Sequence, residues 1–215
     1  MIEAVVFDLD GVIVDSERVW DDVREEYTRE TGGVYPESAT RAMMGMSSVE
    51  WSRYMAEELR VPGSPEQISA AIVERMLARY GEQPPLIAGA ADAVRRAAAR
   101  WPLAIASSSN PELIEVVLRV AGLRELFPVT VSSQEVPRGK PSPDVYLEAA
   151  RRLGVNPASC AAVEDSHNGI RSAKAAGMRV VAVPNPHFPP DADALAHADA
   201  IVRSVAELTP ELLAG

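Results

Sequence analysis

The stretch that decides the fold is Ala4-Val5-Val6-Phe7-Asp8-Leu9-Asp10-Gly11, near the start of the 215-residue chain. Its four apolar residues predict a short buried strand, and Gly11 marks the break where the strand ends. Asp8 and Asp10 can face the same side, where like charges raise each other's pKa. A divalent cation such as Mg²⁺ would relieve that repulsion, so that one carboxylate acts as nucleophile and the other as acid or base. By itself, the stretch fits two solvated turn residues equally well.

Further apolar runs of strand length follow along the chain. They are continuous rather than alternating, which is typical of parallel strands that are buried on both faces. Helical segments lie between them, for example after Asn110-Pro111, and end at glycines such as Gly154. This alternation predicts an α/β fold with a doubly wound, Rossmann-like parallel sheet, whose active site lies at the carboxyl ends of the strands. The expected strands are residues 4–7, 103–106, 129–131, 160–163, 180–183 and 200–202, and the expected helices are 89–100, 111–120, 144–153 and 169–176.

One long stretch interrupts the alternation. Between residues 16 and 80 no strand is evident, and amphipathic helices are expected over 17–31, 49–60 and 65–80. Glycine-containing breaks separate these helices. We therefore expect a small all-helical cap domain, residues 16–81, inserted after the first strand. The Rossmann-like core would consist of residues 1–15 and 82–215, with hinges near 14–15 and 81–85.

Composition and charge exclude several classes of partner. Hydrophobic residues make up 47% of the chain and charged residues 24%, which is typical of a globular protein. The net charge of −10 disfavours nucleic acid and anionic membranes as partners. No apolar run is long enough to span a bilayer, and no secretory signal is evident. The single cysteine, Cys160, is expected to be buried and fits a cytoplasmic location. No obligate protein partner is evident.

Three more polar sites fall where expected strands end. Ser107-Ser108-Ser109-Asn110 offers hydroxyls and the N–H groups of a following helix, which suit phosphate oxygens, although a simple helix cap has the same pattern. Lys140 lies in a stiff Gly-Lys-Pro loop, where a fixed ammonium could neutralise a phosphoryl group rather than serve as a solvated charge. Glu164-Asp165 offers hard oxygen ligands, or else favourable charges before a helix.

In order and spacing, these sites resemble the haloacid dehalogenase superfamily of phosphohydrolases. Its four signature motifs match Asp8-Leu9-Asp10-Gly11, Ser107, Gly139-Lys140-Pro141 and Glu164-Asp165. The resemblance extends to Pro141-Ser142-Pro143-Asp144, Asn168-Gly169-Ile170 and Ala175-Ala176-Gly177-Met178, and so covers nearly all of the core. A helical insert after the first motif is the first cap subclass of this superfamily. Its dehalogenase and phosphonate-cleaving members lack or replace the second acid of the first motif, so Asp10 favours phosphoester chemistry.

The resemblance implies a Mg²⁺-dependent phosphatase that works through an aspartyl phosphate. Asp8 would attack phosphorus, and Asp10 would protonate the leaving oxygen and then activate water. Ser107 and Lys140 would hold the phosphoryl oxygens. The implied metal ligands are the Asp8 carboxylate, the Asp10 carbonyl, Asp165 and, directly or through water, Glu164.

The expected substrate is a small phosphomonoester, such as a sugar phosphate. A β-phosphoglucomutase is the alternative, but its cap carries a His and an Arg where this chain has Trp20 and Ser48. Nearby arginines, Arg18, Arg24, Arg41 and Arg53, keep that alternative open. Trp20 and Trp51 could pack the core of the cap or meet an apolar part of the substrate.

A non-catalytic phosphate-binding protein is a third possibility, disfavoured by the complete set of motif residues. The residues expected to bind substrate are Gly11, Ser108, Asn110, Trp20, Gly45, Met46, Ser47 and Trp51.

Overall fold

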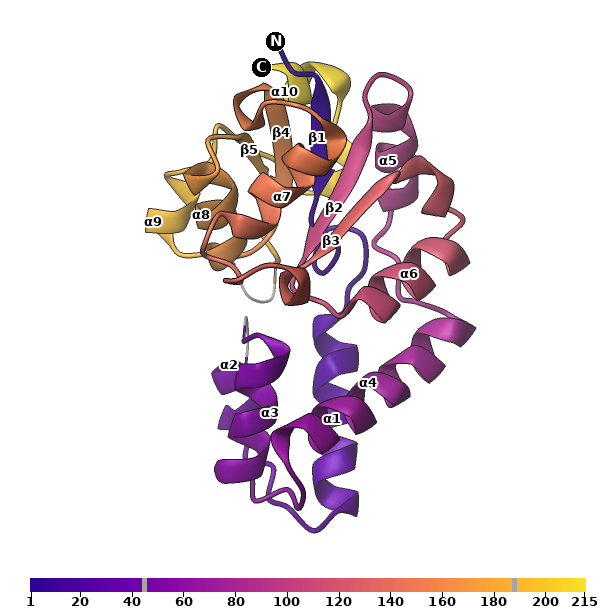
Figure 1. The fold of residues 1–215 in the computed structure, drawn as a ribbon, viewed down its shortest axis with the longest axis vertical. Coiled ribbons are helices and arrows are strands. Elements are labelled where there is room, and N and C mark those ends of the chain that lie inside the picture. The colour runs from indigo at the N-terminus through magenta and orange to yellow at the C-terminus, as the bar shows by residue number, and fades with distance from the viewer. Residues whose placement is uncertain (44–45, 187–188) are drawn as a thin grey trace.

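The apolar runs form one sheet of six parallel strands, in the order β3-β2-β1-β4-β5-β6 (Figure 1). The computed structural model describes residues 1–43, 46–186 and 189–215. The strands are β1 Ala4–Phe7, β2 Leu103–Ser107, β3 Val129–Ser132, β4 Cys160–Glu164, β5 Arg179–Ala182 and β6 Ala200–Ile201. The predicted fold class, a doubly wound sheet, is confirmed. The strand order reverses direction at β1, between β2 and β4, which is where such sheets bind ligands.

Alternate residues of each strand point to opposite faces of the sheet. The side chains on one face are larger than those on the other. Larger residues such as Phe7 and Ile105 face α5 and α6, whereas small residues such as Ala104 and Ala162 face α7 and α8. The small side chains let α7 approach the sheet closely. The core helices are α5 Ala90–Ala98, α6 Pro111–Val120, α7 Asp144–Leu153, α8 His167–Ala175, α9 Ala192–Leu195 and α10 Pro210–Ala214.

The long insert is helical throughout its regular elements, as predicted. It contains α1 Glu17–Glu30, α2 Ser38–Met43, α3 Ser48–Glu57 and α4 Pro65–Glu82. The sequence did not predict α2, nor the short α9 and α10. Capping boxes at Ser47 and Ser64 fix the starts of α3 and α4. In each, the serine hydroxyl accepts from the backbone amide three residues later, and the side chain of that later residue accepts from the serine amide. Figure 1 shows α1–α4 as a separate group facing the carboxyl ends of the strands, while both termini lie at the opposite end.

Two connecting segments join this helical group to the sheet, and they lie side by side. Val14 forms an antiparallel bridge with Leu86, and the Asp15 amide donates to the Pro85 carbonyl at 2.8 Å. The Ile87 amide donates to the Ile13 carbonyl at 2.9 Å. The chain therefore leaves and re-enters the core at one point, which is the arrangement expected of a hinge.

Within the described ranges, no helix combines the length and apolar character needed to cross a membrane. Cys160 is buried at the start of β4, as expected, and burial raises the pKa of its thiol to about 11.

Candidate active site

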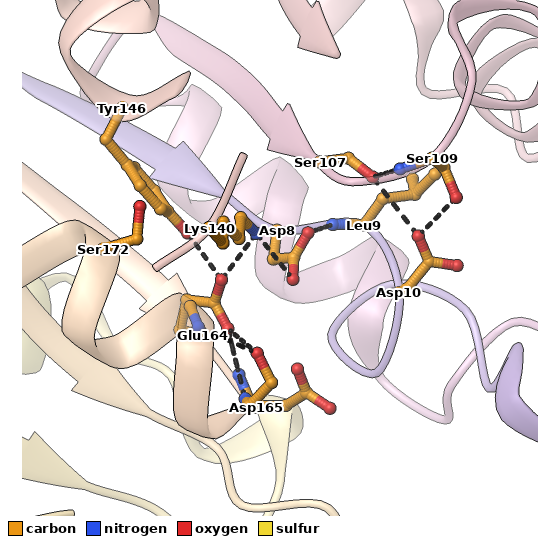
Figure 2. A network of polar contacts seen from close by, with 12 residues as sticks. Asp8, Leu9, Asp10, Ser107, Ser109, Lys140, Tyr146, Glu164, Asp165 and Ser172 are labelled. Atoms are coloured by element: carbon orange, nitrogen blue, oxygen red, sulfur yellow. Dashed lines mark hydrogen bonds and ion pairs between the residues drawn. The ribbon is translucent and has the colours of Figure 1, made fainter. Parts of the chain in front are cut away.

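Polar side chains from the ends of β1, β2 and β4 and from the loop before α7 meet at the carboxyl edge of the sheet (Figure 2). β1 lies between β2 and β4, with Phe7 opposite Ile105 on one side and Val163 on the other. The register therefore sets Asp8 between the ends of the two flanking strands. The loops that follow these strands bring the predicted residues together, although Asp8 and Asp165 lie far apart in the sequence.

The ammonium of Lys140 lies between two buried carboxylates. Its Nζ is 3.0 Å from Asp8 Oδ2 and donates to Glu164 Oε1 at 2.6 Å, and its side chain is 4% exposed. Burial favours a lower pKa for Lys140, but Asp8 and Glu164 outweigh it and raise the pKa. The same ammonium lowers the pKa of Glu164 below its usual range, against the effect of burial. Lys140 is therefore a fixed positive charge, as the stiff loop predicted.

Glu164 uses both of its oxygens within the protein. Oε1 accepts from Lys140 and from the Tyr146 hydroxyl, at 2.8 Å. Oε2 accepts from the amides of Asp165 and Ser166 and from the Ser166 hydroxyl. A Cβ added at Gly169 would lie 1.8 Å from Oε1, so glycine at that position makes room for the carboxylate. Glu164 is thus a buried anchor that holds Lys140, with little capacity left for another ligand.

Three carboxylates, Asp8, Glu164 and Asp165, offer oxygen atoms that lie within 4.8 Å of one another. Burial, followed by the charge of Glu164, raises the pKa of both Asp8 and Asp165 well above the usual range. Gly11 has a φ of 72°, and a Cβ there would lie 1.8 Å from Asp165 Oδ2. Glycine therefore lets the first loop lie directly against Asp165. When all three acids are ionised, Lys140 compensates only one of their charges, and the hard oxygen ligands fit a divalent cation.

Asp10 lies apart from this cluster. Its Oδ2 accepts from the hydroxyls of Ser109, at 2.7 Å, and Ser107, at 3.2 Å, whereas its Oδ1 is buried without a hydrogen bond. Ser107 is fully buried, and its hydroxyl also accepts from the Ser109 amide. A phosphoryl oxygen would have to compete with Asp10 for this hydroxyl. The Asp10 side chain therefore faces the second strand rather than sharing a cation site with the Asp8 side chain.

A cavity of about 490 Å³ lies between these residues and the helical group. We call Asp8, Lys140, Tyr146, Glu164 and Asp165 the catalytic floor, and Trp20, Arg24 and Trp51 the cap wall. Asp8, Lys140 and Asp165 line the cavity from below, and the cap wall lines it from α1 and α3. The indole rings of Trp20 and Trp51 lie 5.9 Å apart and are almost fully buried. They therefore pack the helical group and also border the cavity, and their contact with an apolar part of the substrate stays a prediction.

The other residues expected to bind substrate divide into two groups. Met46 and Ser108 line the cavity, and Ser48 does so as well. Gly11, Ser47 and Asn110 are not among the described lining residues, and Gly45 lies outside the described residues. Ser47 instead caps α3. Asn110 precedes α6 without capping it through its side chain; its Oδ1 accepts from the Ser48 hydroxyl at 3.1 Å and so links the helical group to the core.

Sequence reasoning missed several lining residues. Ser109 was part of a quoted motif but was not singled out, and Arg24 was named only as one of several nearby cations. His167 lines the cavity at the start of α8, 3.0 Å from Asp191 through Nδ1. The proline-rich residues 184–190 predict a surface loop from the sequence, and among the described residues of this segment Asn185, Pro189 and Pro190 line the cavity. The prolines carried no signal of that position.

Comparisons with known proteins agree with this geometry. Residues 2–177 match the family described as haloacid dehalogenase-like hydrolase. A probable pseudouridine-5'-phosphatase of Drosophila melanogaster is 34% identical over 217 residues, covering 96% of this chain and 91% of the other. Hexitol phosphatase B of Escherichia coli (strain K12) is 33% identical over 218 residues, covering 100% of this chain and 97% of the other. Among solved structures, CbbY from Rhodobacter sphaeroides in complex with phosphate superposes with a TM-score of 0.88, at 31% identity and 99% coverage of both chains.

Proposed function

This chain belongs to the haloacid dehalogenase-like hydrolases, and we propose that it is a phosphatase that hydrolyses a small phosphomonoester through a phosphoaspartate on Asp8. The observation that carries the proposal is the position of the Asp8 carboxylate, buried at the sheet edge, beside a fixed ammonium and open to the cavity. The relatives that are named as phosphatases act on small phosphorylated metabolites, according to their names. A sugar phosphate or a metabolite of similar size fits a cavity of about 490 Å³.

Asp8 is the proposed nucleophile. The Leu9 amide donates to Asp8 Oδ1 at 2.7 Å, and Lys140 lies 3.0 Å from Oδ2, so both oxygens are oriented by fixed donors. An Asp8 oxygen would form a bond to phosphorus while the bond from phosphorus to the ester oxygen breaks. Lys140 would neutralise the charge that develops on the phosphoryl oxygens, and Glu164 would keep Lys140 in place.

Asp10 is the proposed acid and base. In its protonated form it would give a proton to the leaving ester oxygen, and as a carboxylate it would then take a proton from the water that attacks the phosphoaspartate. In this structure the Asp10 carboxylate is held by Ser107 and Ser109. We propose that substrate takes over the Ser107 hydroxyl and that the Asp10 side chain turns toward the ester oxygen. Ser107 would thereby link phosphate binding to the position of the acid.

Asp8 and Asp165, together with the Asp10 backbone carbonyl, are the proposed ligands of a Mg²⁺ ion. When bound, the ion supplies positive charge that offsets the phosphate and the two acids. Glu164 has each oxygen occupied by at least two donors, which supports an indirect role for it, through water or through Lys140.

The helical segment, residues 16–81, is proposed to be a cap that moves relative to the core about the paired connecting segments. Closure would exclude bulk water from the phosphoaspartate until substrate and product groups are in place.

Two features of the cap favour a phosphatase over a hexose-phosphate mutase. Trp20 and Ser48 occupy the positions where a mutase would need basic groups, and the Ser48 hydroxyl donates to Asn110. When β-glucose 1-phosphate is supplied with catalytic glucose 1,6-bisphosphate, ³¹P NMR should detect inorganic phosphate as the main product. Rapid formation of glucose 6-phosphate, faster than phosphate release from any tested ester, would contradict this assignment.

The proposed function is tested with a panel of phosphomonoesters, including p-nitrophenyl phosphate and sugar phosphates, with added Mg²⁺. We expect phosphate release that stops after exhaustive EDTA treatment and returns when Mg²⁺ is restored. Activity that survives EDTA would contradict the metal role. A failure to hydrolyse any ester of the panel would count against the phosphatase itself.

A further inference from the structure

The guanidinium of Arg24 packs against two neighbouring indole rings in the wall of the cavity. Its carbon Cζ lies 4.9 Å from the ring centroids of both Trp20 and Trp51. Arg24 is 9% exposed and lines the cavity from α1, and its Nε is buried without a hydrogen-bond partner. The two indole rings restrict the position of the guanidinium, and cation–π attraction offsets part of the cost of burying the charge. The group is therefore preorganised rather than free to rotate.

The charge of Arg24 has no direct counterion among the described residues. None of their carboxylates forms an ion pair or a hydrogen bond with it, and burial lowers its pKa to about 10. Three carboxylates interact with the charge of Arg24 without contacting it, and two of them are hydrogen-bonded to other residues. Asp21 accepts from Tyr35 and Thr40, and Asp10 accepts from two serines. Glu17 is the third; it forms no ion pair with Arg24, and burial, with the charge of Asp10, raises its pKa. A buried cation without a paired anion is costly, unless a ligand supplies the anion.

We propose that Arg24 is a specificity-determining residue that binds a second anionic group of the substrate, a carboxylate or a phosphate, at the end remote from the scissile phosphate. The proposal rests on the proposed phosphatase function and adds the class of substrate. Guanidinium is suited to this task because its planar set of donors matches the oxygens of carboxylates and phosphates. Lys140 at the floor and Arg24 at the wall lie on the two sides of one cavity. A substrate with an anion at each end would satisfy both charges.

The test compares pairs of esters that differ in the second group. For a carboxylate the pair is 3-phosphoglycerate and glycerol 3-phosphate; for a phosphate it is fructose 1,6-bisphosphate and fructose 1-phosphate. In at least one pair, we expect kcat/KM to be ten-fold or more higher for the doubly anionic member. In Arg24→Gln that ratio should fall at least ten-fold, mainly through KM, and in Arg24→Lys it should fall to an intermediate value. The pair that responds identifies the anion.

Arg18→Gln is the matched control, since Arg18 lies on the same helix but is exposed and outside the described cavity lining. It should keep the wild-type ratio. A binding readout avoids dependence on turnover: in Asp8→Asn, the tryptophan fluorescence should change at lower concentrations of the doubly anionic ester, and adding Arg24→Gln should abolish that difference. Circular dichroism checks that each variant folds, and Arg24→Lys alone suffices should Arg24→Gln not fold.

The outcomes separate this proposal from the phosphatase assignment. Equal ratios in wild type and both Arg24 variants, or preference for the singly anionic member of both pairs, would overturn the role of Arg24 and leave the phosphatase intact. If no ester is hydrolysed, the phosphatase assignment fails. The fluorescence titration then decides whether Arg24 selects an anion.

Discussion

The two sides of the cavity differ in whether their charged side chains have hydrogen-bond partners within the protein. On the catalytic floor, Asp8, Lys140 and Glu164 have protein partners at hydrogen-bonding distance: Lys140 contacts two carboxylates, and Glu164 accepts from several donors. On the cap wall, Arg24 packs against two indole rings, and among the described residues its Nε has no hydrogen-bond partner. The floor stands on parallel strands whose register is fixed by the sheet. The wall stands on helices joined to the core through two paired segments.

We infer from this difference that the catalytic floor carries out the chemical step and that the cap wall selects the substrate. Groups that must stabilise a transition state gain most from being fixed before substrate arrives. Groups that select a substrate gain from leaving a charge or surface unsatisfied until the right ligand binds. Substitutions on the floor should therefore lower kcat, whereas substitutions on the wall should raise KM.

The largest expected effect is that of Asp8→Asn. An amide cannot form the phosphoaspartate, so kcat should fall by about 10⁴-fold or more. Asp10→Asn should also reduce kcat severely, because it removes the proposed acid and base. Rates are measured with the best ester of the panel, and thermal unfolding checks the fold. A near wild-type rate in Asp8→Asn would exclude the covalent mechanism.

Lys140→Met should lower kcat by about 10²- to 10³-fold, in the range seen when one preorganised donor is removed. It should also cost about 3–5 kcal/mol of unfolding free energy, because two carboxylates lose their buried partner. The pKa of Asp8 is already raised by burial, and losing the ammonium raises it further. A group whose pKa is higher in the folded state destabilises the fold as it ionises, so the loss should be greater at pH 8 than at pH 5.

Urea unfolding in EDTA at the two pH values measures this effect. The other lysine of the sequence provides the control, since Lys174 forms an exposed pair with Asp199 at 2.9 Å. Lys174→Met should change the unfolding free energy by about 1 kcal/mol or less. If both lysine variants lost the same unfolding free energy, the buried charge of Lys140 would contribute no more to stability than a surface charge.

Trp51→Phe should have a smaller effect of a different kind. The substitution keeps an aromatic ring but removes part of the surface that holds Arg24 and borders the cavity. We expect KM to rise by about 3- to 10-fold, corresponding to about 1 kcal/mol, and kcat to fall by less than KM rises. Steady-state kinetics on the preferred ester check this. A fall in kcat larger than the rise in KM would indicate that Trp51 contributes to the chemical step, like the residues of the catalytic floor.

The smallest expected effect concerns the link between cap and core. The hydrogen bond from Ser48 to Asn110, at 3.1 Å, should contribute about 1 kcal/mol to the arrangement described here. A double-mutant cycle with Ser48→Ala and Asn110→Ala, read out as KM, should give a coupling energy of that size. Additive effects of the two substitutions would show that this contact does not couple cap and core.

The core of the site could be predicted from the sequence because its residues follow strands. Buried strands are recognisable as continuous apolar runs, and their ends must share one edge of a parallel sheet. Asp8, Glu164 and Asp165 were predicted in this way, Lys140 was predicted from its Gly-Lys-Pro loop, and α6 and α7 were predicted at their observed ends. The doubly wound fold followed from the same alternation.

The remainder depends on packing between distant segments, which a single sequence does not encode locally. The contact of Arg24 with two indoles requires α1 and α3 to be packed together, and nothing in its neighbouring residues indicates that. Asn110 precedes α6 and has the residue type of a helix N-cap. Its side chain does not cap the helix, however, because it accepts a hydrogen bond from Ser48 in the helical insert. Tyr146 looks like an ordinary core residue of α7 until its hydroxyl is seen to reach Glu164.

The paired segments at Asp15 and Pro85 also bear on how such a protein changes over generations. An insert whose two ends lie side by side can be lengthened, shortened or exchanged as a unit without rethreading the sheet. Mutation and recombination can therefore replace the helices that we propose select the substrate, while the proposed catalytic residues are inherited unchanged. One ancestral reaction can in this way diversify across many metabolites.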